Sequence, residues 1–127
     1  QITRDIIICD WHYDKHDHGY PSVGQFMESG FFTVPAVAGD LEQAKFFWGF
    51  CLEYCYLSRK LKWPGRLGGL LFTHWAPLTL KNSEELLSAV KKSLRQDPVE
   101  SADIWSSAAA GQVIGRLAPY AGRFKKL

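Results

Sequence analysis

Three short, strongly apolar runs along the chain predict β-strands. Residues 5–10 read D-I-I-I-C-D, and their continuously apolar, β-branched centre is typical of a strand buried on both faces. Residues 31–37 (F-F-T-V-P-A-V) and 69–76 (G-L-L-F-T-H-W-A) predict the second and third strands. Pro35 fits the end of a strand better than its centre, because proline lacks the N–H that a sheet ladder requires.

Helical patterns separate these runs. Ser22 and Gln25 have the spacing of a capping box that opens a short helix, and Gly30 has the position of a C′ glycine. Asp40 and Gln43 predict the start of a longer helix to about residue 60, which carries apolar residues on most of its circumference.

Two further helices are expected in the last third of the chain. Asn82 with Glu85 predicts a capped helix that ends before residue 98. Its apolar stripe is formed by Leu86, Leu87, Val90 and Leu94. The segment from residue 101 to residue 119 is expected to be helical, weakened by Gly111 and Gly115.

The resulting order, β-α-β-α-β-α-α, predicts an α/β fold with a parallel sheet and right-handed crossovers. One interpretation is a small three-stranded α/β domain. The other rests on strand spacings of roughly 25 and 40 residues, which bracket the ~30 residues per unit of a TIM barrel. Because a strand begins almost at once, we interpret residues 1–127 as a single partial domain. It would be the C-terminal part, about three β/α units, of a (β/α)8 TIM barrel.

Composition narrows the classes of function. With 46% apolar residues in 127, the chain can form one core, and a net charge of +2 is too small to indicate a nucleic-acid partner. No apolar run approaches the ~20 residues of a membrane span. Three cysteines, an odd number, argue against a disulfide framework and favour a reducing compartment such as the cytoplasm. Cys51 and Cys55 are expected to be small core residues.

Candidate binding residues follow the strands, because functional groups of parallel α/β folds gather at the carboxyl ends of strands. After the first strand stand Asp10, Trp11, His12 and Tyr13, and after the third stand His74 and Trp75. Carboxylate and imidazole groups suit sugar hydroxyls, and aromatic rings suit the face of a sugar ring. The alternative is that the tryptophans only plug the rim of a barrel.

Three motifs, D-I-I-I-C-D-W-H-Y, Y-P-S-V-G-Q-F-M-E-S-G-F and G-L-L-F-T-H-W, together resemble the final strands of glycoside hydrolase family 20, the β-N-acetylhexosaminidases. The resemblance covers about residues 5–77. It implies that Asp10 and Tyr13 hold sugar hydroxyls and the acetamido oxygen, and that Trp75 forms a wall of the sugar pocket. The family spaces its Asp and Tyr two positions apart, whereas here they are three positions apart. In an extended strand Asp10 therefore shares a face with His12, which becomes a rival ligand.

The resemblance also implies substrate-assisted cleavage of terminal β-linked N-acetylhexosamine. In that reaction the acetamido oxygen attacks the anomeric carbon while a Glu, preceded by an Asp, protonates the leaving oxygen. The chain contains no Asp-Glu dipeptide. It is therefore expected to supply sugar-binding residues but no catalytic residue, metal or cofactor, and to be inactive without a missing N-terminal part of the barrel.

Two alternatives come from other classes of function. The loop of residues 12–18 places His12, His16 and His18 near two aspartates, which is a pattern able to bind zinc or a related ion. A protein-interaction module without catalytic activity is the second alternative, since the helix around residues 46–56 has more apolar residues than one stripe needs.

Overall fold

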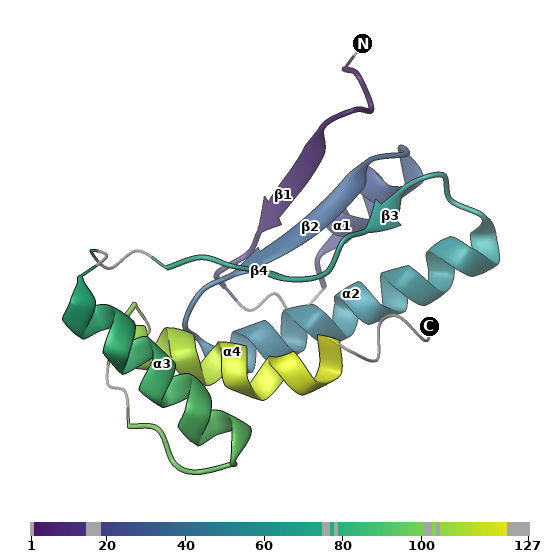
Figure 1. The fold of residues 1–127 in the computed structure, drawn as a ribbon. Coiled ribbons are helices and arrows are strands. Elements are labelled where there is room, and N and C mark those ends of the chain that lie inside the picture. The colour runs from purple at the N-terminus through teal and green to yellow at the C-terminus, as the bar shows by residue number, and fades with distance from the viewer. Residues whose placement is uncertain are drawn as a thin grey trace.

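The computed structural model describes residues 2–14, 19–74, 77, 79–100, 103 and 105–121. The order of elements is β1 (Ile7–Trp11), α1 (Pro21–Glu28), β2 (Phe32–Val37), α2 (Leu41–Leu61), β3 (Arg66–Leu67), β4 (Leu71–Phe72), α3 (Leu80–Leu94) and α4 (Ser107–Ala121). The α/β alternation and the parallel sheet follow the prediction (Figure 1). Membership of this sheet in a barrel stays a prediction.

The sheet has β2 at its centre, with β1 on one side and both β3 and β4 on the other. Thr33 pairs with Leu67, whereas Val37 pairs with Phe72, so the β3–β4 side contains one residue more than β2. This is the signature of a β-bulge. Gly69, which adopts a φ of +113°, lies at the break. Only β4 lies within the strand predicted over residues 69–76, and β3, on the other side of the break, was not predicted.

Pro35 explains where this break lies. On the side of β3 and β4, three carbonyls accept backbone hydrogen bonds: that of Phe31, just before β2, from Arg66, that of Thr33 from Gly68, and that of Val37 from Thr73. Because backbone groups alternate along a strand, position 35 faces the same neighbour, and proline has no N–H to donate. The prediction that Pro35 ends a strand is therefore wrong, since it lies inside β2 opposite the bulge.

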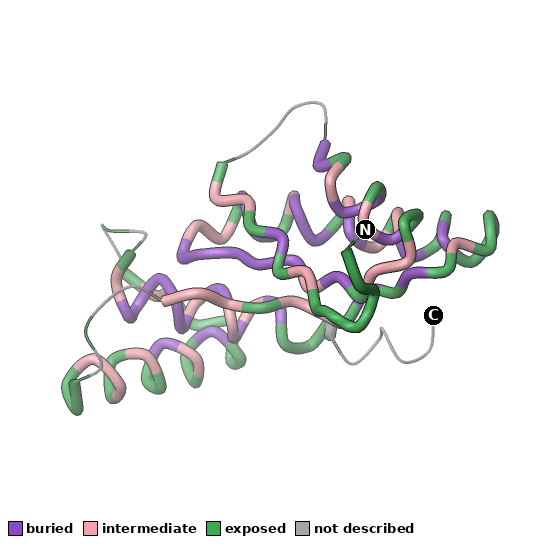
Figure 2. The backbone as a smooth tube through the Cα atoms, turned by 90° about the horizontal axis from the view of Figure 1, so that it is seen from above, coloured by how far each residue is buried: buried purple, intermediate pink, exposed green. Residues whose placement is uncertain are grey.

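Helices cover one face of the sheet only. The covered face is formed by Thr33, Pro35, Val37 and Leu67, which are all buried. On the opposite face Ile7 is 61% exposed, Cys9 is exposed, and the neighbouring apolar side chains Phe32 and Leu71 are also exposed. Figure 2 shows exposed residues along β1 and the segment before it. The prediction that the first strand is buried on both faces is therefore wrong for the described residues.

Helix α1 begins differently from the prediction. Its N-cap is Tyr20, which makes no side-chain cap, and the helix starts instead with Pro21, whose missing N–H costs nothing at this position. The expected capping box of Ser22 and Gln25 is therefore wrong. At the other end Gly30 adopts a φ of +93°, which confirms it as the C′ glycine.

Helix α2 is capped as predicted by Asp40, whose carboxylate accepts the backbone N–H groups of Glu42 and Gln43. It lies along the covered face of the sheet (Figure 1). The core that it shares with the sheet and α1 consists mainly of Tyr20, Val23, Met27, Val37, Ala44, Phe47, Trp48, Cys51 and Cys55. The two cysteines are thus confirmed as core residues. No helix in the described part of the chain is long and apolar enough to cross a membrane.

Burial raises the pKa of the Cys51 thiol well above its ordinary value of 9.0, and the nearby carboxylate of Asp10 adds to the shift. The unfolded chain therefore loses this proton first as the pH rises. The stability that the neutral thiol contributes is complete below pH 9.0 and falls by about 1.4 kcal/mol per pH unit above it. In urea unfolding from pH 7 to 10, the free energy of unfolding should fall less steeply with pH for Cys51→Ala than for the wild type.

The control for this prediction is Cys9→Ala, because Cys9 is exposed. It should keep the alkaline slope of the wild type. Burial also raises the pKa of Tyr54 and Cys55, so part of the slope should survive in Cys51→Ala. If the free energy of unfolding falls equally steeply with pH in Cys51→Ala and in the wild type, the Cys51 thiol is not the source of the loss.

Helices α3 and α4 form a pair beside the sheet layer (Figure 1). The N-cap of α3 is Thr79, whose hydroxyl accepts the N–H of Asn82, so the predicted capping by Asn82 and Glu85 is wrong. The expected apolar stripe is also only partly buried, since Leu87 and Leu94 are more than half exposed. The buried positions of α3 are instead small residues, Ala89 and Ser93.

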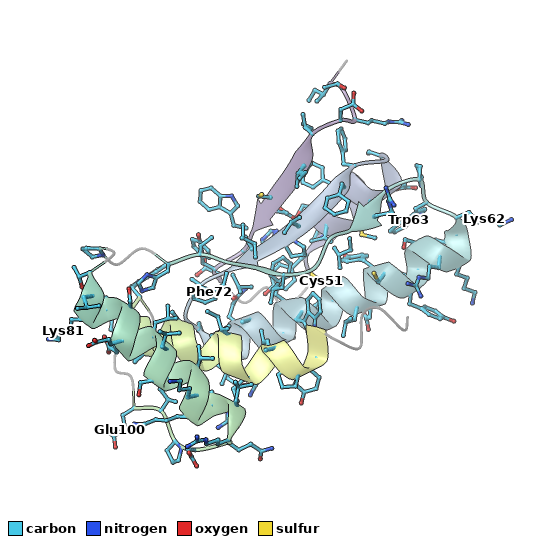
Figure 3. All side chains as sticks on the ribbon, in the orientation of Figure 1. Cys51, Lys62, Trp63, Phe72, Lys81 and Glu100 are labelled. Carbon is cyan, nitrogen blue, oxygen red and sulfur yellow. The ribbon has the colours of Figure 1, made fainter. Side chains whose placement is uncertain are left out.

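Small residues line both sides of the α3–α4 contact. A Cβ atom on Gly111 would lie 2.4 Å from the carbonyl oxygen of Leu86, and one on Gly115 would lie 2.5 Å from the Cβ of Ser93. These glycines, expected to weaken the last helix, let the two helix backbones approach closely. An apolar pocket of about 150 Å³, partly open to solvent, lies between α4, α2 and β4 and is lined in part by Phe72 (Figure 3).

Candidate functional site

The end of β1 directs its polar and aromatic side chains to opposite faces of the sheet. Asp10, 9% exposed, points to the face covered by helices, and His12 is within 3.3 Å of its carboxylate. The expectation that these two residues share a face is confirmed. Trp11, which alternates with them, is 58% exposed and belongs to the uncovered face.

Asp10, His12 and Ser22 form a closed triangle under the sheet. The hydroxyl of Ser22 donates to Asp10 Oδ2 over 2.8 Å. His12 Nε2 lies 2.9 Å from Ser22 Oγ and 3.3 Å from Asp10 Oδ1. The imidazole packs edge-to-face with Tyr20 and Phe47, whose ring centroids are 4.8 and 5.0 Å away. The triangle therefore joins β1 to α1, with α2 packed against it.

The triangle lacks the geometry of a nucleophilic triad. In a triad one imidazole nitrogen contacts the serine while the other contacts the carboxylate. Here the same nitrogen of His12 faces both groups, and Ser22 directs its proton to Asp10. The cluster thus holds neighbouring elements in place rather than activating the serine.

Three aromatic rings gather at the carboxyl end of β1 and form what we term the aromatic platform: Trp11, Tyr13 and Trp105. The ring centroids of Trp11 and Tyr13 are 5.8 Å apart, and Trp105 stands edge-on to Tyr13 at 5.6 Å. Trp105 is 42% exposed. Its backbone N–H is held by the carboxylate of Asp103, which places the indole in the turn before α4.

Tyr13 is anchored through its hydroxyl to the end of the next strand. Thr73 Oγ1 donates to the carbonyl of Val37 and lies 2.9 Å from the Tyr13 hydroxyl. Because the Thr73 proton is already used, Tyr13 is the donor in this pair. The ring position is therefore fixed by the carboxyl ends of β1, β2 and β4 together.

The remaining predicted residues follow β4. His74 Nε2 lies 3.2 Å from Ser107 Oγ, so this imidazole is linked to the first turn of α4. Trp75 lies outside the described residues, and its predicted role stays a prediction. The sequence interpretation included neither Trp105, which follows no strand, nor Ser22, which it assigned to a helix cap.

The metal-binding alternative falls mostly on residues outside the described part, since residues 15–18 of the loop belong there. Among the described residues, no group of three or more His, Cys, Asp or Glu side chains could hold an ion. It therefore stays a prediction for His16 and His18.

The platform and its surroundings combine apolar ring faces with nearby polar groups from Thr73, His74 and Asp103. Comparisons with protein-family models, curated protein sequences and solved structures found no match to this chain.

Proposed function

We propose that the aromatic platform binds a sugar by stacking on the apolar face of its ring. The observation that carries this proposal is the convergence of Trp11, Tyr13 and Trp105 at the carboxyl end of a parallel sheet. Both tryptophans are substantially exposed, although burial would be expected if they served only as core. The carboxyl end is also where α/β folds bind their ligands.

In its more specific form, the proposal is that the chain is the C-terminal part of a (β/α)8-barrel glycosidase acting on terminal β-linked N-acetylhexosamine. The resemblance to glycoside hydrolase family 20 supports it. So does the one-sided sheet, because a barrel has helices outside and apolar strand residues such as Ile7 and Phe32 inside. The acid that protonates the leaving oxygen would come from residues outside this sequence.

This arrangement changes the role proposed for Asp10. The resemblance implies that Asp10 holds sugar hydroxyls, but its carboxylate is nearly buried and bound to Ser22 on the helix side. We therefore propose that Asp10 and His12 are positioning residues, which fix the end of β1. Trp11, Tyr13 and Trp105 would then contact the sugar directly.

Titration of the chain with N,N′-diacetylchitobiose, followed by tryptophan fluorescence and calorimetry, tests the platform. Trp105→Ala should weaken binding about tenfold, because stacking on an aromatic ring contributes roughly 0.5–1.5 kcal/mol beyond the buried area. Trp63→Ala is the matched control. Trp63 follows Lys62, the C-cap of α2 (Figure 3), whereas Gln43 near the other end of α2 contacts His12 at the end of β1, so the loss of Trp63 should leave the affinity unchanged.

The results distinguish sugar binding by the platform from the more specific proposal of a barrel glycosidase. Equal affinities for Trp105→Ala and the wild type, or no binding of any N-acetylhexosamine oligosaccharide, would contradict the platform. Hydrolysis of an aryl β-N-acetylglucosaminide by this chain alone would contradict the external acid. Hydrolysis only by a longer protein that contains the chain is the expected result.

A further inference from the structure

Helix α3 carries a row of three exposed leucines, which we term the leucine row. Leu80, Leu87 and Leu94 are 78%, 55% and 53% exposed, and each is seven positions from the next. Seven residues make almost two helical turns, so the three side chains form one row about 21 Å long. The buried residues of α3, Ala89 and Ser93, lie on the other side of the helix, toward α4.

Two opposite charges stand within this row. Glu84 lies between Leu80 and Leu87, Lys91 lies between Leu87 and Leu94, and both are exposed. Neither side chain forms an ion pair with another residue that the structure describes. The order along the row is therefore leucine, acid, leucine, base, leucine.

This order is complementary to its own reverse. We propose that two copies of the chain pair through α3 in an antiparallel manner, about a two-fold axis at Leu87. Leu87 then meets Leu87 of the second copy, and Leu80 meets Leu94 at both ends. Glu84 precedes the axis by three positions and Lys91 follows it by four, so each carboxylate lies beside an ammonium of the other copy. Both copies use the same patch, as a two-fold interface requires.

The two charges favour a second copy over other occupants of the row. A lipid surface or an apolar groove offers no partner to a carboxylate in the middle of the row, and burial of an unpaired charge costs free energy. An opposite charge at the matching position offsets this cost and fixes the register. A parallel pair would set Glu84 beside Glu84 and Lys91 beside Lys91, which is repulsive. The charges therefore select the antiparallel arrangement, as flanking charges do in coiled coils.

The proposed dimer goes beyond sugar binding and is compatible with it. Helix α3 lies at the outside of the described structure and packs chiefly on α4 (Figure 1). The leucine row includes no residue of the sheet or of the aromatic platform. The dimer thus uses none of the strand edges at which a barrel would continue.

Sedimentation equilibrium of the full chain and two charge variants tests the pairing. The wild type is expected to show a monomer–dimer equilibrium. Glu84→Lys and Lys91→Glu should each weaken it about tenfold or more, because like charges then meet at two places in the interface. An equimolar mixture of the two variants should dimerise again, since every carboxylate then lies beside an ammonium of the other chain.

Lys92→Glu is the matched control for Lys91→Glu. Both lysines lie in the last turn of α3, so the two substitutions have the same effect on the helix dipole. Position 92 lies about 100° further around the helix, outside the leucine row, and its substitution should leave the dimer unchanged. Leu87→Glu is a second, independent variant, which should abolish the dimer by placing two carboxylates at the axis. Circular dichroism should show that all variants keep their helices.

Three results would overturn the proposal. One is a chain that sediments as a monomer at every concentration, including a monomer that instead binds phosphatidylcholine vesicles. Another is a dimer that both charge variants leave intact. The third is a mixture that dimerises no better than either variant alone. Trp105→Ala should dimerise like the wild type, so a failure of sugar binding and a failure of the dimer are seen separately.

Discussion

Replacing Gly111 with valine should destabilise the fold by about 3 kcal/mol or more, which is the upper range for inserting bulk into a packed site. The first added carbon would lie 2.4 Å from the carbonyl oxygen of Leu86 and 2.6 Å from the Cβ of Ala89. The obstructing oxygen belongs to a helix backbone, so rotation of a side chain cannot relieve the contact. Helix α3 would have to move away from α4. Urea unfolding followed by circular dichroism measures the loss.

Gly49 provides the matched control. It also lies inside a helix, but a Cβ there would meet nothing within 4 Å. Gly49→Ala should therefore stabilise the chain by roughly 0.5–1 kcal/mol, because alanine restricts the unfolded chain more than glycine does. Similar effects for the two substitutions would show that the α3–α4 contact is not close.

Replacing Asp10 with alanine should cost about 2–3 kcal/mol, because it removes an acceptor from a nearly buried cluster. The hydroxyl of Ser22 and the ring of His12 would lose the carboxylate that lies between them. Asp5→Ala is the control. Asp5 is exposed and contacts only its neighbour Thr3 among the hydrogen bonds described, so its loss should change stability by less than ~0.5 kcal/mol.

A double-mutant cycle with Ser22→Ala resolves the contact itself. Because the two side chains are hydrogen-bonded, the double variant should be destabilised by about 1 kcal/mol less than the sum of the two single variants. The same variant separates two roles for Asp10. If it is a positioning residue, folded Asp10→Ala should keep most of the affinity for diacetylchitobiose. A loss larger than that of Trp105→Ala would place Asp10 in the sugar site, as the family resemblance implies.

The parallel α/β arrangement could be predicted because its signals are local. The β-branched run before Asp10, the cap at Asp40 and the glycine at position 30 each specify one conformation without distant contacts. The break between β3 and β4 was not predictable in this way. It depends on Pro35 facing residues more than thirty positions away, and that pairing is a property of the assembled sheet.

The residues of the candidate site that have a local sequence signal were predicted, and those that depend on the assembled fold were not. Strand ends locate Asp10, Trp11 and Tyr13 directly, because strand ends can be recognised in the sequence. Ser22 fits a capping box equally well, and only the approach of α1 to β1 assigns its hydroxyl to Asp10. Trp105 precedes a helix and reaches the platform only because α4 returns to the carboxyl end of the sheet.

The contacts of α3 and α4 lead us to expect two regions of unequal local stability. Helix α3 packs chiefly on α4, and an apolar pocket that is partly open to solvent lies between α4, α2 and β4. Amide hydrogens of α3 and α4 should therefore exchange through partial openings that leave α2 and β2 protected. Trp105 belongs to the less stable region and Tyr13 to the more stable one. A ligand that contacts both rings would thus hold the two regions together. Its binding should slow the exchange of amide hydrogens throughout α3.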